Sequence, residues 1–97
     1  MELEQLKERA SEVSDILKTM AHPERLMVLC QLIDGEVGVG QLQENTALSQ
    51  SAFSQQLSVL KKHNLVKVRK ESQQVFYSLA DERIKALIAS FHSIFCN

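Results

Sequence analysis

Apolar side chains near the start of the chain recur at alternating steps of three and four residues. They are Leu3, Leu6, Ala10, Val13, Leu17 and Met20. This spacing predicts a first helix of about five turns that carries a heptad seam. Such a narrow seam suits a partner helix, in the same chain or in a second copy. The helix should end at residues 21–23, because Pro23 disfavours helical backbone at His22 and can itself begin the next helix.

The next apolar pattern predicts a second helix from Pro23 to about Ile33. Its expected buried side consists of Leu26, Leu29, Cys30 and Ile33. The helix should end at Asp34-Gly35-Glu36, where Gly35 can supply a left-handed cap. A short third helix is predicted from Val39 to about Asn45, and residues 46–48 are predicted to form a turn.

The helix predicted from Gln50 to about His63, with Ser49 as its N-cap, has one apolar and one polar side. Its apolar side consists of Phe53, Leu57 and Leu60. Its polar side carries amides, hydroxyls and finally two lysines: Gln50, Ser51, Ser54, Gln55, Ser58, Lys61 and Lys62. Glutamine can pair bidentately with adenine, serine can bond several base edges, and lysine suits phosphates. These side chains are candidate DNA contacts, and the alternative is a polar face that meets only solvent.

Two strand-like runs follow, Val66–Arg69 and Gln74–Leu79, and the polar residues between them predict a β-hairpin. Arg69 and Lys70 should lie near its tip, where a hairpin can reach the DNA backbone or minor groove. A last helix is predicted from Asp81 to Cys96. Its apolar stripe contains Ile84, Leu87, Ile88, Phe91 and Phe95. These elements predict a mainly α-helical fold with a β-hairpin wing, a winged helix-turn-helix, in a single domain spanning residues 1–97.

Charge is distributed unevenly along the chain, although the net charge is only −1. Residues 37–70 hold five basic residues and one acid, Glu44, so this third of the sequence carries +4. The remainder carries −5. A basic module beside an acidic body favours binding to a polyanion, for which double-stranded DNA is the expected partner. The alternative is a solvated lysine-rich surface.

Length and composition limit the other possibilities. The 97 residues, 44% of them apolar, suit one small domain with little stability to spare, for which dimerisation is a common remedy. No apolar run approaches the ~18 residues of a membrane span, so we expect no membrane partner. The acidic, amphipathic N-terminus is unlike a signal peptide, which predicts a cytoplasmic protein.

Two cysteines, Cys30 and Cys96, are too few for a disulfide framework. Cys30 stands among leucines, where packing alone would explain it. Cys96 lies off the centre of the last helix's apolar stripe and near the chain end, where exposure would make it reactive. The two thiols could meet if the last helix packs across the second. The sequence leaves open whether they are core fillers or a reactive pair.

Three stretches, "LKTMAHPERLMVLCQL", "LSQSAFSQQLSVLKKHNLVKVRKESQQVFYSL" and the terminal "FC", resemble the ArsR/SmtB family of bacterial winged-helix repressors. The resemblance implies a homodimer built through the first and last helices, with two recognition helices in successive major grooves. Half-site centres about 34 Å apart would then follow from two-fold symmetry. Gln56 stands where many members have histidine, a departure that could alter base preference.

The metal sites common in this family are not matched. Gly38 and Gly40 occupy the two positions of a Cys-Val-Cys arsenic motif, and Arg83 and Ile94 occupy ligand positions of the zinc-type site. Neither glycine nor these two side chains can hold a metal, so we expect no metal and no cofactor. One zinc hypothesis stays open, because His92 precedes Cys96 by one helical turn and could join both thiols.

The cysteine positions resemble the two-cysteine, BigR/SqrR/HlyU-like subgroup of this family. That resemblance implies a redox-sensing role for Cys30 and Cys96, in which reactive sulfur or an oxidant joins them through a disulfide or polysulfide and switches off operator binding. A rival hypothesis is a constitutive or anti-silencing DNA-binding regulator whose thiols are only structural. An enzyme is not expected, because the chain has neither a Cys-x-x-Cys motif nor a phosphate-binding glycine loop.

Overall fold

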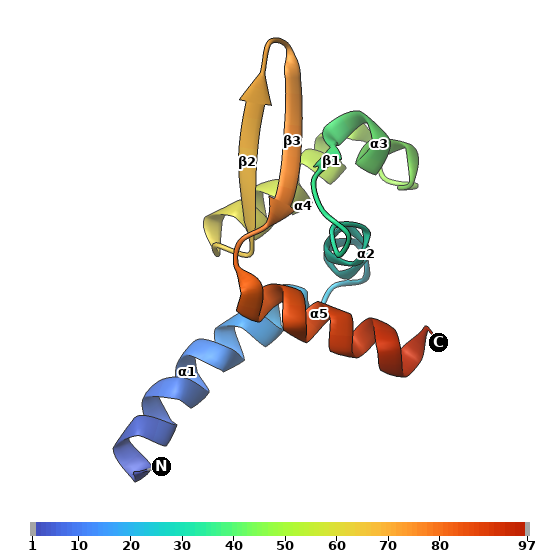
Figure 1. Ribbon diagram of the computed structural model, residues 1–97. Coiled ribbons are helices and arrows are strands. Elements are labelled where there is room, and N and C mark those ends of the chain that lie inside the picture. The colour runs from blue at the N-terminus through green and yellow to red at the C-terminus, as the bar shows by residue number, and fades with distance from the viewer. Residues whose placement is uncertain (1, 97) are drawn as a thin grey trace.

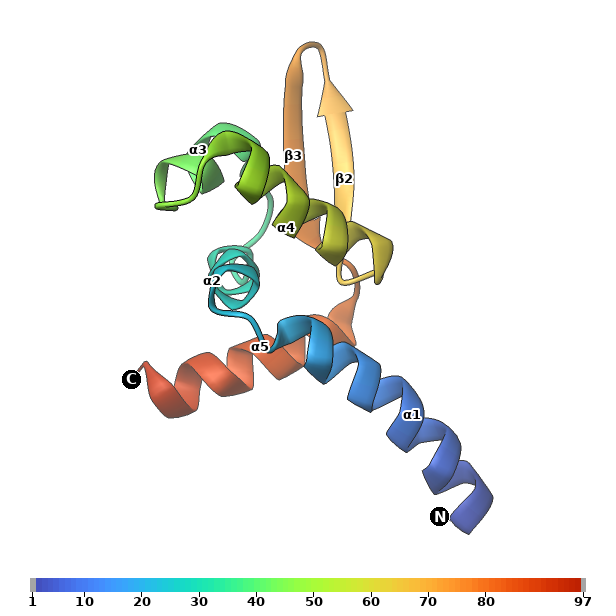
Figure 2. The same cartoon turned by 180° about the vertical axis from the view of Figure 1, so that it is seen from behind.

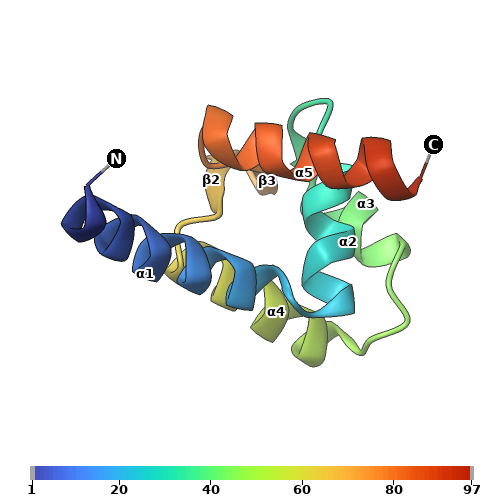
Figure 3. The same ribbon diagram turned by 90° about the horizontal axis from the view of Figure 1, so that it is seen from below.

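The computed structural model describes residues 2–96, in which a β-hairpin projects from one side of a helical body (Figure 1). Helices α1 and α5 form the opposite side, and α2 lies between them and the hairpin (Figures 1 and 3). The elements in chain order are α1 (Leu3–Met20), α2 (Pro23–Gln31), β1 (Val37–Gly38), α3 (Val39–Glu44), α4 (Gln50–Lys62), β2 (Val66–Glu71), β3 (Gln74–Leu79) and α5 (Glu82–Phe95). This is the predicted winged helix-turn-helix. None of the described helices has both the length and the apolar character that crossing a bilayer requires.

Side-chain caps fix where three helices begin. His22 accepts a hydrogen bond from the Glu24 N–H through Nδ1 at 3.1 Å, and Pro23 follows it as the first helical residue. The hydroxyl of Ser49 accepts from the Ala52 N–H at 3.2 Å, and Asp81 accepts from the Ile84 N–H at 3.0 Å. Each cap satisfies a helix N–H that has no partner within the helix. The predicted starts of α2 and α4 are confirmed.

The sheet has three strands in the order β1-β3-β2, whereas the sequence predicted only the hairpin. The added strand, β1, is two residues long and pairs antiparallel with β3, with Val37 opposite Tyr77. A strand of two residues is too short to give a detectable alternation. The predicted bounds of β3 are confirmed, and β2 is two residues longer than predicted because it extends to Glu71. Ser72, which begins the remaining two-residue turn, adopts a left-handed backbone with φ of 55°.

The core lies where α2, α4, α5 and the base of the hairpin meet. Its fully buried members include Leu29, Leu42, Leu60, Leu65 and Ile88. Burying each such side chain stabilises the fold by about 1.5–3 kcal/mol. On α2 the prediction was wrong in part, because Val28, Leu29 and Leu32 are buried while Leu26, Cys30 and Ile33 are only half-buried. α2 also ends at Gln31, two residues before the predicted end.

Apolar side chains remain exposed on α1 and at the end of α5. Along the α1 heptad seam, exposure is 64% at Leu3 and 42% at Leu17, and only Met20 reaches the core. On α5, Phe95 is 81% exposed. The α1 seam therefore has no partner helix within the described part of this chain.

Candidate nucleic-acid interface and thiol pair

Helix α4 presents the predicted polar face to solvent. Its exposed residues include Gln50, Ser51, Ser54, Gln55, Ser58, Lys61 and Lys62. Beneath them Phe53, Leu57 and Leu60 are buried, so packing fixes which side of the helix faces outward. Figure 2 shows α4 running across the body close to the base of the hairpin. The helix therefore offers an uninterrupted face of amides, hydroxyls and ammonium groups, the chemistry that base edges and phosphates require.

Gln56 does not belong to that face. It is half-buried, and its Oε1 accepts a hydrogen bond from Nη1 of Arg25 on α2 at 2.8 Å. The departure from the family pattern at this position thus faces the fold rather than the solvent. Sequence reasoning missed this contact, because the two residues are 31 positions apart and no local spacing links them.

The wing places Arg69 against two carboxylates. Its guanidinium donates to Glu36 through Nη2 at 2.7 Å and Nε at 3.0 Å, and to Glu71 through Nη1 at 2.7 Å. It also lies over the Phe76 ring, with 4.7 Å from Cζ to the ring centroid. The hydrogen bond from Arg69 holds the pKa of the Glu36 carboxyl below its usual value.

These two carboxylates lower the net positive charge around the wing. Glu36 and Glu71 flank the basic block of residues 37–70 in sequence and both contact Arg69, so the block together with them carries +2 rather than +4. Lys70 is exposed and makes no ion pair with any of residues 2–96. Lys70 is therefore the freer of the two predicted wing cations, and Arg69 as a DNA contact stays a prediction.

The thiols of Cys30 and Cys96 come from two helices that pack together, α2 and α5. Cys30 is half-buried on α2, whereas Cys96 is exposed at the C-cap of α5, and both are free thiols. Burial raises the pKa of the Cys30 thiol, and the neighbouring Cys96 thiol raises it further because two thiolates would repel each other. The structure thus brings the two cysteines near one another and gives them different access to solvent.

A metal site at these thiols finds no support. Residues 2–96 contain no group of three histidine, cysteine, aspartate or glutamate side chains positioned to hold a metal ion. His92, the third member of the hypothetical zinc site, contacts Cys96 through its backbone carbonyl, which accepts from the Cys96 N–H at 2.9 Å.

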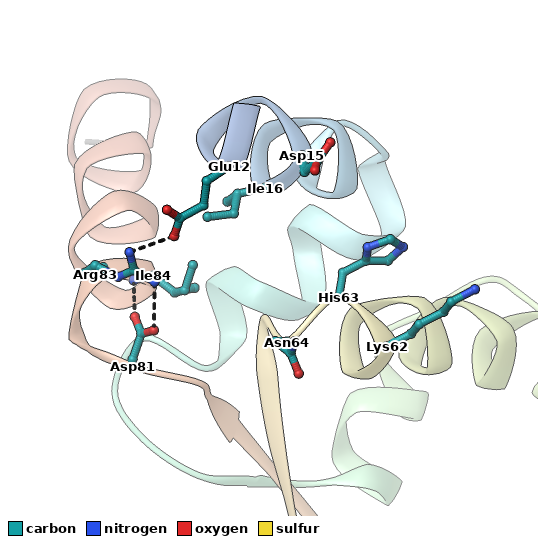
Figure 4. A pocket seen from close by; sticks show the side chains of 9 residues that line it. All are labelled: Glu12, Asp15, Ile16, Lys62, His63, Asn64, Asp81, Arg83 and Ile84. Atoms are coloured by element: carbon teal, nitrogen blue, oxygen red, sulfur yellow. Dashed lines mark hydrogen bonds and ion pairs between the residues drawn. The ribbon is translucent and has the colours of Figure 1, made fainter. Parts of the chain in front are cut away.

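The zinc-type position at the start of α5 is occupied by an ion-pair cluster (Figure 4). Arg83 binds Glu12 of α1 at 2.9 Å and Asp81 at 3.5 Å, beside a polar cavity of about 370 Å³. The Ile84 N–H, and to a smaller extent the Arg83 charge, lower the pKa of Asp81. The guanidinium thus joins α1 to α5 and uses the carboxylate that a cation would otherwise bind.

Comparison with known proteins identifies the class. The family described as bacterial regulatory protein, arsR family, matches residues 22–68. The biofilm growth-associated repressor of Xylella fastidiosa is 40% identical over 96 residues, spanning 99% of this chain and 84% of that protein. The transcriptional activator HlyU of Vibrio cholerae is 42% identical over 96 residues, spanning 99% and 89%. The structure of reduced HlyU from Vibrio cholerae superposes with a TM-score of 0.92 at 41% identity, over 98% of this chain and 100% of that one.

The chain therefore belongs to the arsR family of bacterial regulatory proteins. The resemblance to the family read from the sequence is confirmed, and HlyU is one of the relatives that this resemblance named. Proteins of this family are DNA-binding transcription regulators and not enzymes. The two named relatives are a repressor and an activator, so the direction of regulation differs among the chain's own relatives.

Proposed function

We propose that this protein is a homodimeric regulator, most simply a repressor, that binds operator DNA when its thiols are reduced and releases it when Cys30 and Cys96 are joined. The observation that carries the proposal is that an exposed thiol at the C-cap of α5 and a half-buried thiol on α2 belong to two helices that pack together. A covalent link there would tie together one helix of the core and one end of an exposed apolar surface.

The dimer part of this proposal rests on the apolar side chains that a single chain leaves in solvent. A groove of about 390 Å³ between α1 and α5 is lined by Val13, Ile16 and Leu87 among others. A second, of about 290 Å³, is lined by Leu17, Met20, Ala21, Leu26, Phe91 and Phe95. The α1 seam and α5 of a second copy are suitable occupants, because a two-fold interface joins the same surface on both subunits.

The DNA part rests on the exposed face of α4 and on Lys70 of the wing. In a two-fold dimer the two α4 helices would read half-sites centred about 34 Å apart. Gln50, Ser51, Ser54, Gln55 and Ser58 are the proposed base-edge contacts. Lys61, Lys62, Arg69 and Lys70 are the proposed phosphate contacts, with Arg69 contributing less because Glu36 and Glu71 hold its guanidinium.

The thiol chemistry begins at Cys96, which is accessible. Its thiolate attacks the outer sulfur of an organic hydropersulfide, R–S–SH, giving Cys96–S–SH and releasing R–S⁻. The Cys30 thiolate then attacks the Cys96 sulfur, forming the Cys30–Cys96 disulfide and expelling HS⁻. If Cys96 has received two sulfurs, as Cys96–S–S–SH, attack on its middle sulfur leaves a trisulfide and again expels HS⁻. Cellular thiols reverse either link by exchange.

The coupling to DNA is mechanical. A bridge between α2 and α5 favours a dimer geometry in which the two α4 helices no longer match successive major grooves. A coupling of about 1–3 kcal/mol between the two sites corresponds to about a 5–150-fold change in affinity.

The test uses an operator selected from random duplexes by the reduced protein. Operator affinity is measured by fluorescence anisotropy before and after an organic persulfide for the wild type, Cys30→Ser and Cys96→Ser. We expect release by the wild type alone, while both variants bind throughout. Release by Cys30→Ser would mean that the pair is not the switch. If the fully reacted wild type keeps its operator affinity, the result would favour the constitutive regulator.

A further inference from the structure

Three side-chain hydrogen bonds tie α2 to the helix-turn-helix. Thr46 in the turn donates from Oγ1 to Glu24 at 2.7 Å, and Asn45 donates from Nδ2 to Gln31 at 2.8 Å. The third is the bond from Arg25 to Gln56 at 2.8 Å, the one of the three whose partner lies on the recognition helix. α2 thus contacts the turn through Glu24 and the helix itself through Arg25.

Arg25 has a second partner, on α1. Its Nε donates to the backbone carbonyl of Thr19 at 2.6 Å. Thr19 lies in the last turn of α1, where helix carbonyls lack partners within the helix, and its side chain is buried and donates to the Asp15 carbonyl. One guanidinium therefore joins the end of α1, the first turn of α2 and the middle of α4.

Gln56 lies in a row of half-buried residues along α4. Ala52, one turn before it, and Val59, three residues after it, are also half-buried, whereas Gln55 beside it is exposed. Successive residues on a helix are about 100° apart around its axis. Fixing Gln56 against α2 therefore fixes the direction in which Gln55 points. The apolar residues beneath α4 fix which side of the helix faces outward, and the directional hydrogen bond adds a second constraint on rotation about the helix axis.

We propose that Arg25 and Gln56 are positioning residues for operator recognition, which set the rotation of α4 relative to α1 and α2 without touching DNA. The bond is charge-assisted and half-buried, the setting in which a hydrogen bond contributes most. The proposal depends on DNA binding alone and stands whether or not the thiols form a switch.

Two other roles for Arg25 make different predictions. Loss of a phosphate contact would weaken specific and nonspecific binding alike and lower the salt slope of log affinity by about one for each subunit. A purely structural role would lower the melting temperature and leave the ratio of specific to nonspecific affinity unchanged. A positioning residue lowers that ratio and leaves the salt slope as it was.

The experiment compares Arg25→Gln, Arg25→Lys, Gln56→Ala and the double variant Arg25→Gln/Gln56→Ala with the wild type. Lys85→Gln is the control, because it removes one exposed positive charge on α5. Affinity is measured for the selected operator and for a scrambled duplex at several salt concentrations, with melting temperatures recorded in parallel. Arg25→Lys keeps the charge but cannot span both acceptors, so it separates charge from positioning.

We expect each of the three single variants to bind the operator about tenfold more weakly, with less than a twofold change on the scrambled duplex and an unchanged salt slope. The double variant should bind the operator no more weakly than Arg25→Gln alone, because both single variants remove the same Arg25–Gln56 bond. A salt slope reduced by about one per subunit in Arg25→Gln, with wild-type binding by Arg25→Lys, would overturn the proposal. The proposal would also be overturned if the losses of operator affinity were additive in the double variant. The same holds if the variants had lower melting temperatures but an unchanged ratio of specific to nonspecific affinity.

Discussion

Helices α4 and α5 use their apolar side chains differently. On α4 the exposed fraction is 2% at Phe53, 4% at Leu57 and 0% at Leu60, so its apolar side is covered by this one chain. On α5, Ile88 is fully buried, but Ile94 and Phe95 near its end are 69% and 81% exposed. The apolar side of α4 is covered within one chain, whereas the end of α5 next to Cys96 is not.

This difference indicates where a covalent switch can act. Segments with few buried contacts open or move at a lower free-energy cost than the core does. A link made at the end of α5 can change that end and the proposed dimer surface without opposing the packing of α4. The DNA-binding face would then change its position in the dimer rather than its internal structure.

The largest effect should follow from removing a core side chain under α4. Leu60→Ala should lower the free energy of unfolding by about 2–5 kcal/mol, because it leaves a cavity in a fully packed site. Guanidinium unfolding at a fixed protein concentration measures this, with Ser58→Ala on the exposed side of α4 as the control. Equal losses in Leu60→Ala and the control would contradict the burial described for α4.

On α5, Phe95→Ala should mainly weaken the formation of the proposed dimer. It should raise the dimer dissociation constant by at least about tenfold, because the interface loses two copies of a large aromatic side chain and about 1.4 kcal/mol in total corresponds to tenfold. Sedimentation equilibrium measures the constant, and Ser93→Ala is the neighbouring exposed control. An unchanged constant would remove the end of α5 from the proposed interface.

A substitution on the exposed face of α4 should weaken DNA binding without weakening the dimer. Gln55→Ala should weaken operator binding by about 1–3 kcal/mol if the amide reads a base, and leave the dimer constant unchanged. Fluorescence anisotropy with the selected operator measures the loss, and Gln41→Ala on α3 serves as the matched exposed amide. Equal operator affinities for the two variants would contradict a base contact by Gln55.

Within the wing, the two predicted cations should differ. Lys70→Ala should reduce the salt slope of log affinity by about 1.8, which is about 0.9 for one phosphate contact in each of the two subunits. Arg69→Ala should reduce it by less than half as much, because Glu36 and Glu71 already balance its charge. Titrations from low to moderate salt give the slopes. Equal reductions would show that Arg69 leaves its carboxylates when DNA binds.

The smallest expected effect is a difference between the rates at which the two thiols are alkylated. At pH 7, iodoacetamide should label Cys96 faster than Cys30, because Cys30 is less accessible and its raised pKa lowers its thiolate fraction. The labelling of Cys30 should accelerate as the pH rises through its raised pKa. Peptide mass spectrometry over time measures both rates, and faster labelling of Cys30 at neutral pH would reverse the proposed order of attack.

The sequence predicted the features that depend on neighbours in the chain. The Ser49 cap, the two sides of α4 and the hairpin follow from spacings of a few residues, and all three occur in the structure. The contacts it missed join distant positions. Arg69 meets Glu36 and Arg25 meets Gln56 across 33 and 31 residues, so only tertiary packing brings them together. The charge count likewise overstated the basic surface, because it stopped one residue short of Glu36 and Glu71.

The central claim is that joining Cys30 to Cys96 releases the operator. The most direct measurement takes intact mass and operator affinity on the same wild-type sample, before and after an organic persulfide, with diamide as an oxidant control. We expect a mass consistent with an intramolecular disulfide or polysulfide and an affinity lowered by about 5–150-fold. A bridged protein that binds the operator as tightly as the reduced protein would contradict it.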